Sequence, residues 1–320
     1  MGKLPRLLIE QTAKLPFFRG EAQAEFFRKG LANIAIRAQH GGKVYLVKYA
    51  VAPASKPSVF IQADYEKRIY ERVRSLGISP RIFAFGRIKI SGRIFPYTIQ
   101  ELIDGKMPDY RRDLKKIAST LAFLHSHTRG KASITDYRMI HTHAYLENKA
   151  SSKKGEKADK AVEPLLAELR EEGLAYLRKH PIRKDYLCLV HNDLTQENLL
   201  ISRKKCYLID WGWAMYSSAA IDICNVLSPF TTSWTSRMIL KPEDAEVFLK
   251  AYLRHFPKYE ADLLLRAADA YWLSYNSMLL DWIHDDFLPS RHHSKAYFSK
   301  PDFLRKARIF INRVHCIMEK

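Results

Sequence analysis

One segment near the middle of the chain constrains the fold more than any other part of the sequence. The apolar run LCLV at 187–190 predicts a buried strand that ends where a polar loop begins. Two more short strands are predicted, LLIS at 199–202 and CYLID at 206–210, joined by the basic turn at 203–205. A hairpin of this kind returns the end of its second strand to the start of its first. We therefore expect Asp210 to lie beside the end of the polar loop.

Three polar side chains follow these strands at spacings that suit a metal-assisted phosphoryl transfer. Asp193 would accept the proton of an attacking hydroxyl group. Asn198, five residues later, and Asp210, twelve beyond that, would hold Mg2+ against nucleotide phosphates. Each residue alone has another explanation, because Asp and Asn are favoured in turns and caps between strands. The three together favour a kinase.

The same motifs carry a family resemblance. The runs HNDLTQENLL at 191–200 and LIDW at 208–211, with Ile-Asp-Ile at 221–223, resemble the aminoglycoside phosphotransferase and choline kinase superfamily. In that superfamily the loop reads roughly HxDLxxxNxL and is followed by IDW. Asn192 is more similar to the choline and ethanolamine kinase branch, because the aminoglycoside branch usually has Gly there.

The resemblance implies an α+β, two-lobed, protein-kinase-like fold. Residues 1–102 would form the N-lobe, with a five-stranded antiparallel sheet and one helix that cover the nucleotide. Residues 103–320 would form a larger, mostly helical C-lobe with the catalytic loop, the metal site and the acceptor-binding helices. ATP would lie between the lobes. His191 would brace the catalytic loop by hydrogen bonds, and Asp222 would support it.

A lysine and a glutamate upstream extend the match to the first lobe. KVYLVKYA at 43–50 alternates as a strand does and carries Lys48 near its end. The stretch at 62–79 predicts a helix with Glu66 in its first turn and a glycine stop signal. The resemblance implies that Lys48 and Glu66 pair, which fixes the lysine on the nucleotide phosphates. The alternatives are a solvated lysine, a glutamate that serves the helix dipole, and Glu71 in place of Glu66.

Two other stretches resemble nucleotide contacts of the superfamily. Gly30 would let the backbone approach a phosphate, and Asn33 matches the Asn of the family's nucleotide-covering hairpin. A single glycine is equally compatible with a plain hairpin turn. The strand-like run at 93–106 breaks at Asp-Gly, and the matching family segment links the lobes and meets the adenine. The candidates for that contact are Gln100, Glu101 and Leu102.

An aromatic and acidic segment at 267–286 is the candidate for binding the phosphoryl acceptor. Aromatic faces combined with carboxylates are typical of sites for protonated or quaternary amines. Choline kinase relatives carry an aromatic-rich helix at about this place. The candidate residues are Trp272, Tyr275, Asp281, Trp282 and Asp285. The alternative is that the aromatic residues belong to the core and the aspartates to a solvated helix end.

The net charge of +19, from 53 basic and 34 acidic residues, is the discordant feature. A charge of this size can indicate a nucleic-acid or anionic-membrane partner. The basic residues are dispersed, however, and no RRM, helix-turn-helix or zinc-finger pattern surrounds them. We therefore expect a solvated basic surface that attracts an anionic nucleotide, and keep a polyanion site as the alternative.

The cysteines and the hydropathy indicate the compartment. The four cysteines form no CxxC pair, so neither a metal knuckle nor a disulfide scaffold is indicated. No stretch approaches the roughly 18 uncharged apolar residues of a membrane span. We expect a cytoplasmic protein, and the sequence carries no expectation about its oligomeric state.

These observations together predict an ATP- and Mg2+-dependent kinase. It would move the γ-phosphoryl group to a hydroxyl of a small metabolite, with an amino alcohol such as choline or ethanolamine preferred. An aminoglycoside or a sugar is the alternative acceptor. A non-catalytic relative that binds a nucleotide or a polyanion is the alternative of a different class.

Overall fold

The computed structural model divides into two compact units. The first unit comprises Met1–Lys106 and Leu200–Trp213, and the second comprises Met107–Leu199 and Ala214–Lys320. The hairpin that carries Asp210, expected in the second lobe, therefore clusters with the first unit, and the first boundary lies at Lys106 instead of residue 102. The structure describes residues 3–30, 32–53, 58–130, 163–179, 187–203, 205–236, 238–283 and 300–320.

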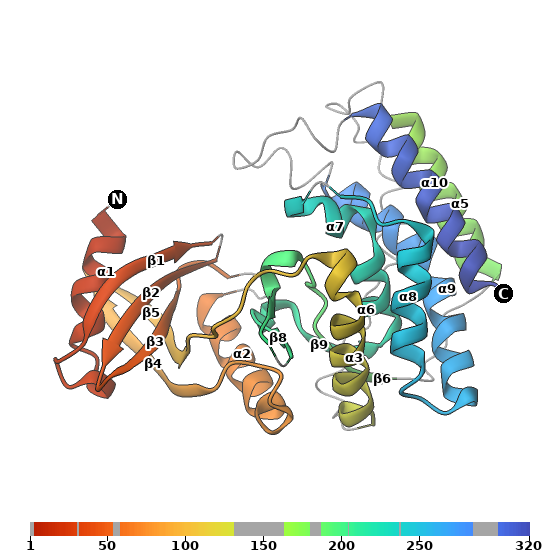
Figure 1. Ribbon diagram of the computed structural model, residues 1–320. Helices are drawn as coiled ribbons and strands as arrows, with labels where there is room; N and C mark the ends of the chain where they lie inside the picture. Colours follow the sequence, from red (N-terminus) through yellow and green to blue (C-terminus); the bar gives the residue numbers. More distant parts are fainter. Residues whose placement is uncertain are drawn as a thin grey trace. The chain divides into compact units, whose positions relative to one another are not determined.

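The first unit is built on a five-stranded antiparallel sheet in the order β1-β2-β3-β5-β4 (Figure 1). β2 turns into β3 at Gly41-Gly42, and β4 turns into β5 at Ser91-Gly92, all with positive φ. Two-residue turns with positive φ match the twist of antiparallel strands. The expected five-stranded sheet is confirmed. Its strands are β1 Gln23–Lys29, β2 Asn33–His40, β3 Lys43–Ala50, β4 Ile82–Ile90 and β5 Arg93–Glu101.

A helix that was not expected from the sequence packs on the core of this sheet. α1 (Lys3–Ala13) buries Leu8 and Thr12, and Leu8 joins the cluster of buried apolar side chains from β2 and β3. The Oγ1 atom of Thr12 lies 2.9 Å from the hydroxyl of Tyr49 on β3. We expected one helix in this unit, and the structure has two α-helices. The short 3-10 helix η1 (Pro16–Phe18) follows α1.

The expected helix around Glu66 is confirmed as α2 (Val59–Val73), but it begins earlier than expected, so the placement of Glu66 in its first turn was wrong. It begins at Ser58, whose hydroxyl accepts the backbone N–H of Ile61 at 3.3 Å, as N-cap residues do. It ends through the 3-10 turn η2 (Arg74–Leu76) at Gly77, which has a φ of 62° and is the expected stop signal. Glu66 thus lies on a well-capped helix.

The expected hairpin is also confirmed, as β7 (Leu199–Ile201) and β8 (Cys206–Leu208). Ile201 exchanges two backbone hydrogen bonds with Lys106, at 2.7 and 3.1 Å. The N–H of Leu208 donates to the carbonyl of Ile78 at 2.8 Å. These bonds explain why the hairpin belongs to the first unit.

The second unit is mostly helical, as expected (Figure 1). Its small sheet pairs β6 (Leu187–Val190) with β9 (Met215–Ser218), and the polar loop leaves β6 toward the 3-10 turn η4 (Gln196–Asn198). The long helix α9 packs against α5, α6 and α10. The helices are α3 Tyr110–Thr128, α5 Glu163–Lys179, α6 Ala220–Leu227, α7 Pro229–Ser236, α8 Pro242–Leu253, α9 Lys258–Trp282 and α10 Pro301–Met318.

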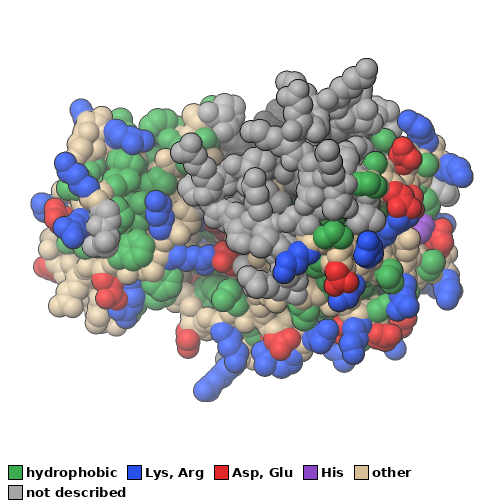
Figure 2. Space-filling view, turned by 90° about the horizontal axis from the view of Figure 1, so that it is seen from above, with side chains coloured by type: hydrophobic (Ala, Val, Ile, Leu, Met, Phe, Trp, Pro, Cys, Tyr) green, Lys and Arg blue, Asp and Glu red, His purple; other side chains and the backbone are tan. Residues whose placement is uncertain are grey.

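Two further findings concern the distribution of charge and the possibility of membrane-spanning helices. In Figure 2, the described residues of the visible face carry Lys and Arg side chains at several separate places, with Asp and Glu side chains among them. None of the helices that the structure describes combines the length and the apolarity that a membrane span requires.

Candidate active site

The structure brings Asp193 and Asn198 together in the second unit. Asn198 donates through Nδ2 to the Oδ2 atom of Asp193 at 2.8 Å and to its backbone carbonyl at 2.8 Å. Both side chains are half-buried. Because Nδ2 faces Asp193, the Oδ1 atom of Asn198 is the one available to a cation. The loop thus presents a carboxylate and an amide oxygen in fixed orientations.

Asp222 holds the backbone on the N-terminal side of Asp193. It lies in the first turn of α6 and is fully buried. Its carboxylate accepts the backbone N–H groups of His191 at 2.8 Å and of Asn192 at 2.7 Å. The ring of His125 contacts the same carboxylate, with Nε2 at 3.0 Å from Oδ2. Bonds to several donors compensate the burial of this charge, and they give Asp222 the supporting contacts expected of it.

The backbone of the loop requires an unusual residue at position 192. Asn192 has a φ of 61°, in the left-handed region that Gly and Asn tolerate better than other residues. This conformation gives a physical reason for an asparagine at position 192. Asp210 also has a left-handed φ, of 65°. Left-handed residues other than glycine often occur at functional sites.

In the first unit, Lys48 forms its ion pair with Asp210. The Lys48 Nζ atom lies 2.9 Å from the Asp210 Oδ1 atom. Burial alone would lower the pKa of Lys48, but the attraction of Asp210, Tyr70 and Glu66 outweighs it, so the pKa is raised. The Lys48 ammonium therefore stays charged at neutral pH.

Glu66 takes a different partner from the one that the resemblance implied. Gln62, one turn earlier on α2, donates through Nε2 to Glu66 at 3.0 Å and to the carbonyl of Gly212 at 3.0 Å. Burial raises the pKa of Glu66, although the nearby charge of Lys48 opposes this shift. Gln62 was not identified from the sequence, because a buried glutamine on an amphipathic helix carries no distinctive pattern.

A cavity of about 200 Å³ in the first unit brings Asn33, Lys48 and Glu66 to one wall. Gly30 closes the turn before β2, where its N–H donates to the carbonyl of Asn33 at 2.8 Å. A methyl group added to Gly30 would meet only this carbonyl oxygen, at an ordinary 3.7 Å. Neither a lack of space nor a positive φ requires glycine at this position. The structure therefore favours the alternative that Gly30 is part of a plain hairpin turn.

The three candidates for the adenine contact lie at the end of β5. The Glu101 N–H donates to the Arg81 carbonyl at 2.8 Å, and its carboxylate accepts the Arg81 N–H at 3.2 Å. Gln100 is buried, and its Oε1 atom has no hydrogen-bond partner among the described residues. Leu102 is the first residue beyond the strand. The backbone of Glu101 is thus engaged within the sheet.

The structure separates the candidates for acceptor binding. Trp272 is fully buried and donates to the carbonyl of Ile311 at 2.7 Å, and Tyr275 is also buried. These two agree with the core alternative. Trp282 is 37% exposed and stacks on Trp234, with the ring centroids 6.2 Å apart. Asp285 and the side chain of Asp281 lie outside the described residues.

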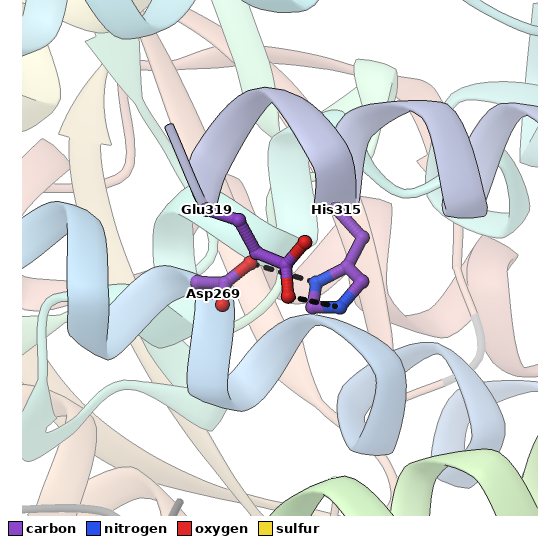
Figure 3. Close-up of side chains that lie close together, drawn as sticks. All are labelled: Asp269, His315 and Glu319. Atoms are coloured by element: carbon purple, nitrogen blue, oxygen red, sulfur yellow. Dashed lines mark hydrogen bonds and ion pairs between the residues drawn. The ribbon is translucent and has the colours of Figure 1, made fainter.

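A second titratable cluster lies on α9 and α10 (Figure 3). Among the described side chains, Asp269, His315 and Glu319 are close enough to share a metal ion. His315 Nδ1 lies 2.7 Å from Asp269 and Nε2 lies 3.3 Å from Glu319, and the Tyr176 hydroxyl donates to Asp269. The bond to Asp269 raises the pKa of His315. Both ring nitrogens of His315 face carboxylates, which a protonated ring can satisfy by donating from each nitrogen. We therefore assign the cluster as an ion pair that joins the two helices, instead of a metal site.

Comparisons with solved structures find the same fold in several kinases. The Plasmodium vivax ethanolamine kinase is 16% identical with a TM-score of 0.61, over 97% of this chain and 90% of that chain. A choline/ethanolamine kinase family protein from Mesorhizobium loti is 12% identical with a TM-score of 0.63, over 96% of both chains. An aminoglycoside phosphotransferase from Alicyclobacillus acidocaldarius is 16% identical with a TM-score of 0.60, over 92% of both. No curated protein matches the sequence.

The sequence itself matches a family over most of its length. The model of the phosphotransferase enzyme family matches residues 23–262. That range contains Lys48, Asp193, Asn198 and Asp210. The match and the shared fold confirm the resemblance that the catalytic loop carries, and with it the kinase-like fold. The chain therefore belongs to the phosphotransferase enzyme family and is an enzyme of the small-molecule kinase class.

Proposed function

We propose that this phosphotransferase uses ATP and Mg2+ to phosphorylate a hydroxyl group of a small metabolite, with Asp193 as the catalytic base. The observation that carries the proposal is the 2.8 Å hydrogen bond from Asn198 to Asp193 on a loop held by buried Asp222. A carboxylate held in this way is ready to orient an acceptor hydroxyl and take its proton.

The donor set fits a magnesium ion. Asn198 offers an amide oxygen and Asp210 a carboxylate that is 39% exposed, and Mg2+ prefers such hard oxygen ligands. When bound, Mg2+ would neutralise phosphate charge and orient the γ-phosphoryl group. Asp193 would remain the proton acceptor in this arrangement.

The first unit would hold the nucleotide. The Lys48 ammonium would contact the phosphates, and Glu66 would keep it in place through its negative charge. Asn33 lines the same cavity as these two residues. Leu102 is the better candidate for a backbone contact with the base, because the Glu101 N–H already donates to Arg81.

For the acceptor, we propose an amino alcohol such as choline or ethanolamine. Asn192 supports this choice through its similarity to the choline and ethanolamine kinase branch. The stacked pair Trp234 and Trp282 offers an aromatic face of the kind that holds an ammonium group. An aminoglycoside or a sugar is the alternative. The described basic side chains that are visible in Figure 2 lie among acidic ones, which supports a solvated surface over a polyanion site.

The test is a screen of hydroxyl-bearing metabolites for Mg2+-dependent release of ADP. We expect turnover with an amino alcohol, and loss of at least 1,000-fold in kcat for Asp193→Ala, because the base would be missing. Asp302→Ala is the control, since this aspartate is exposed on α10 and pairs only with neighbouring Lys306. Full ADP release by Asp193→Ala, or none by the wild type with any acceptor, would contradict the proposal.

A further inference from the structure

A second buried contact holds the catalytic loop, on the C-terminal side of Asp193. The backbone N–H of Leu194 donates to Asn225 Oδ1 at 2.9 Å. Asn225 lies on α6, three residues after Asp222 and on the same face of the helix. Asp222 holds the backbone before Asp193, and Asn225 holds the backbone after it. The two residues therefore fix the loop on both sides of the proposed base.

A hydrogen bond to Tyr275 holds the Asn225 side chain in place. Asn225 donates through Nδ2 to the hydroxyl of Tyr275 at 2.6 Å, and Tyr275 is buried in α9. A backbone N–H can only donate, so the Leu194 N–H requires the Oδ1 atom of Asn225, and Nδ2 is left for the tyrosine. Loss of the Tyr275 hydroxyl would remove this second bond and let the amide turn away from Leu194. The Tyr275 hydroxyl thus anchors the amide that holds the loop.

The protonation state of Tyr275 is compatible with this role. Burial raises the pKa of its hydroxyl, the bond from Asn225 opposes the shift, and the negative charges of Asp222 and Asp193 add to it. The hydroxyl is therefore neutral at all pH values at which the enzyme would work, and its oxygen remains an acceptor for the amide.

We propose that Asn225 and Tyr275 are positioning residues for the reaction. They act through the backbone of Leu194 and keep the carboxylate of Asp193 directed at the acceptor hydroxyl. This inference rests on the proposed role of Asp193. A displacement of about 1 Å at a reacting group can cost about 100-fold in rate. Both residues belong to the second unit and act on its loop, so their loss should lower kcat and leave the KM for ATP unchanged.

The first experiment compares Tyr275→Phe with Ser228→Ala. The Ser228 hydroxyl donates to Asn276 at 2.7 Å, so it also joins the end of α6 to α9, beside Tyr275 but without a bond to the loop. Both variants lose one buried hydroxyl. We expect kcat to fall about 10-fold in Tyr275→Phe, with a KM for ATP within about twofold of the wild type, and less than a twofold change in Ser228→Ala. Equal effects of the two variants on kcat would overturn the proposal.

A pair of variants at Asn225 gives a readout that a purely structural role would not move. Asn225→Asp keeps an acceptor for the Leu194 N–H and can accept from Tyr275, whereas Asn225→Ala loses both bonds. We expect Asn225→Ala to lower kcat at least as much as Tyr275→Phe, and Asn225→Asp to recover most of that loss. A kcat of Asn225→Asp as low as that of Asn225→Ala would count against the positioning role.

Hydrogen exchange separates a failure of this inference from a failure of the proposed function. The peptide that contains Leu194 should exchange its amides faster in Tyr275→Phe, whether or not the protein turns over. If Asp193→Ala abolishes turnover and Tyr275→Phe does not reduce it, the function stands and the positioning role fails. If Asp193→Ala leaves turnover intact, the proposed function fails, and the positioning role fails with it.

Discussion

The ammonium of Lys48 and the carboxylate of Asp210 lie 2.9 Å apart, although 162 residues separate them in the sequence. This pair joins β3 to the segment that follows the β7–β8 hairpin, within a first unit that is discontinuous in the sequence. A proposed phosphate contact and a proposed metal ligand are thus neighbours within one compact unit.

Removal of the Lys48 charge should therefore affect nucleotide use more than stability. Lys48→Met keeps the length of the side chain but loses the phosphate contact, so we expect kcat/KM for ATP to fall about 100-fold. Lys306→Met is the matched control, because Lys306 is an exposed lysine in an ion pair on α10. Steady-state kinetics with varied ATP test this, and a loss of less than threefold would exclude a phosphate contact by Lys48.

Gln62 should be needed for the binding of ATP, because it holds Glu66 beside Lys48. It bridges the Glu66 carboxylate and the Gly212 carbonyl, so Gln62→Ala frees both groups. We expect the KM for ATP to rise about fivefold, since one lost hydrogen bond is typically worth about 1 kcal/mol. Gln39→Ala is the control, because Gln39 lies on β2 of the same unit but is exposed. An unchanged KM would show that Glu66 is held without Gln62.

The sequence predicted those features that depend on local patterns. The strand–loop–hairpin segment around Asp193, the helix that carries Glu66 and its glycine stop all follow from periodicity and turn chemistry within a few residues. The five antiparallel strands were expected from the resemblance. These are the parts of the fold that place the proposed catalytic loop.

The features that the sequence did not predict depend on tertiary contacts. Nothing local to β3 shows that Lys48 pairs with Asp210 instead of Glu66. The aromatic residues of α9 suggested an acceptor site, but α9 packs against several other helices, and so Trp272 and Tyr275 are buried. Gln62 and Asn225 are neutral amides that each make two hydrogen bonds that only the folded chain brings about, and no spacing in the sequence distinguishes them from surface residues.

Asp222 should be the most sensitive position of the loop for stability. Asp222→Ala leaves the N–H groups of His191 and Asn192 and the ring of His125 without their buried acceptor. Loss of one partner from a buried charged network typically costs about 3 to 5 kcal/mol. Urea unfolding should show a loss of about 3 kcal/mol or more. Asp302→Ala, an exposed aspartate, should change the free energy of unfolding by less than about 0.5 kcal/mol. Similar values for the two variants would contradict the buried network.

The cluster at the end of α10 should make stability depend on pH. The pKa of His315 is raised above its ordinary 6.5 by the bond to Asp269, with further contributions from Glu319 and Glu172, while burial opposes the shift. A group whose pKa is higher in the folded state than in the unfolded state stabilises the folded protein. This stabilisation is complete at pH values below the unfolded-state pKa and is lost as the pH rises through the folded-state pKa. The difference in the free energy of unfolding between wild type and His315→Gln should be largest below about pH 6 and should shrink toward pH 9. A difference that grows with pH would show that His315 is held in its neutral form.

The left-handed backbone at Asn192 leads to a comparison of two small substitutions. Asn192→Gly can adopt a φ of 61° without strain, whereas Asn192→Ala places a Cβ atom in a conformation that costs about 1 to 2 kcal/mol. Asn192→Ala should therefore unfold at lower urea concentration than Asn192→Gly, by about 1 kcal/mol in the free energy of unfolding. Both variants lose the same side-chain amide, so the difference between them isolates the effect of the backbone.

The same backbone strain should also affect activity. The N–H of residue 192 donates to Asp222, so relaxation of the strained backbone in Asn192→Ala would also disturb Asp193. We therefore expect kcat to fall more in Asn192→Ala than in Asn192→Gly. Equal stability of the two proteins would mean that residue 192 leaves the left-handed region in solution.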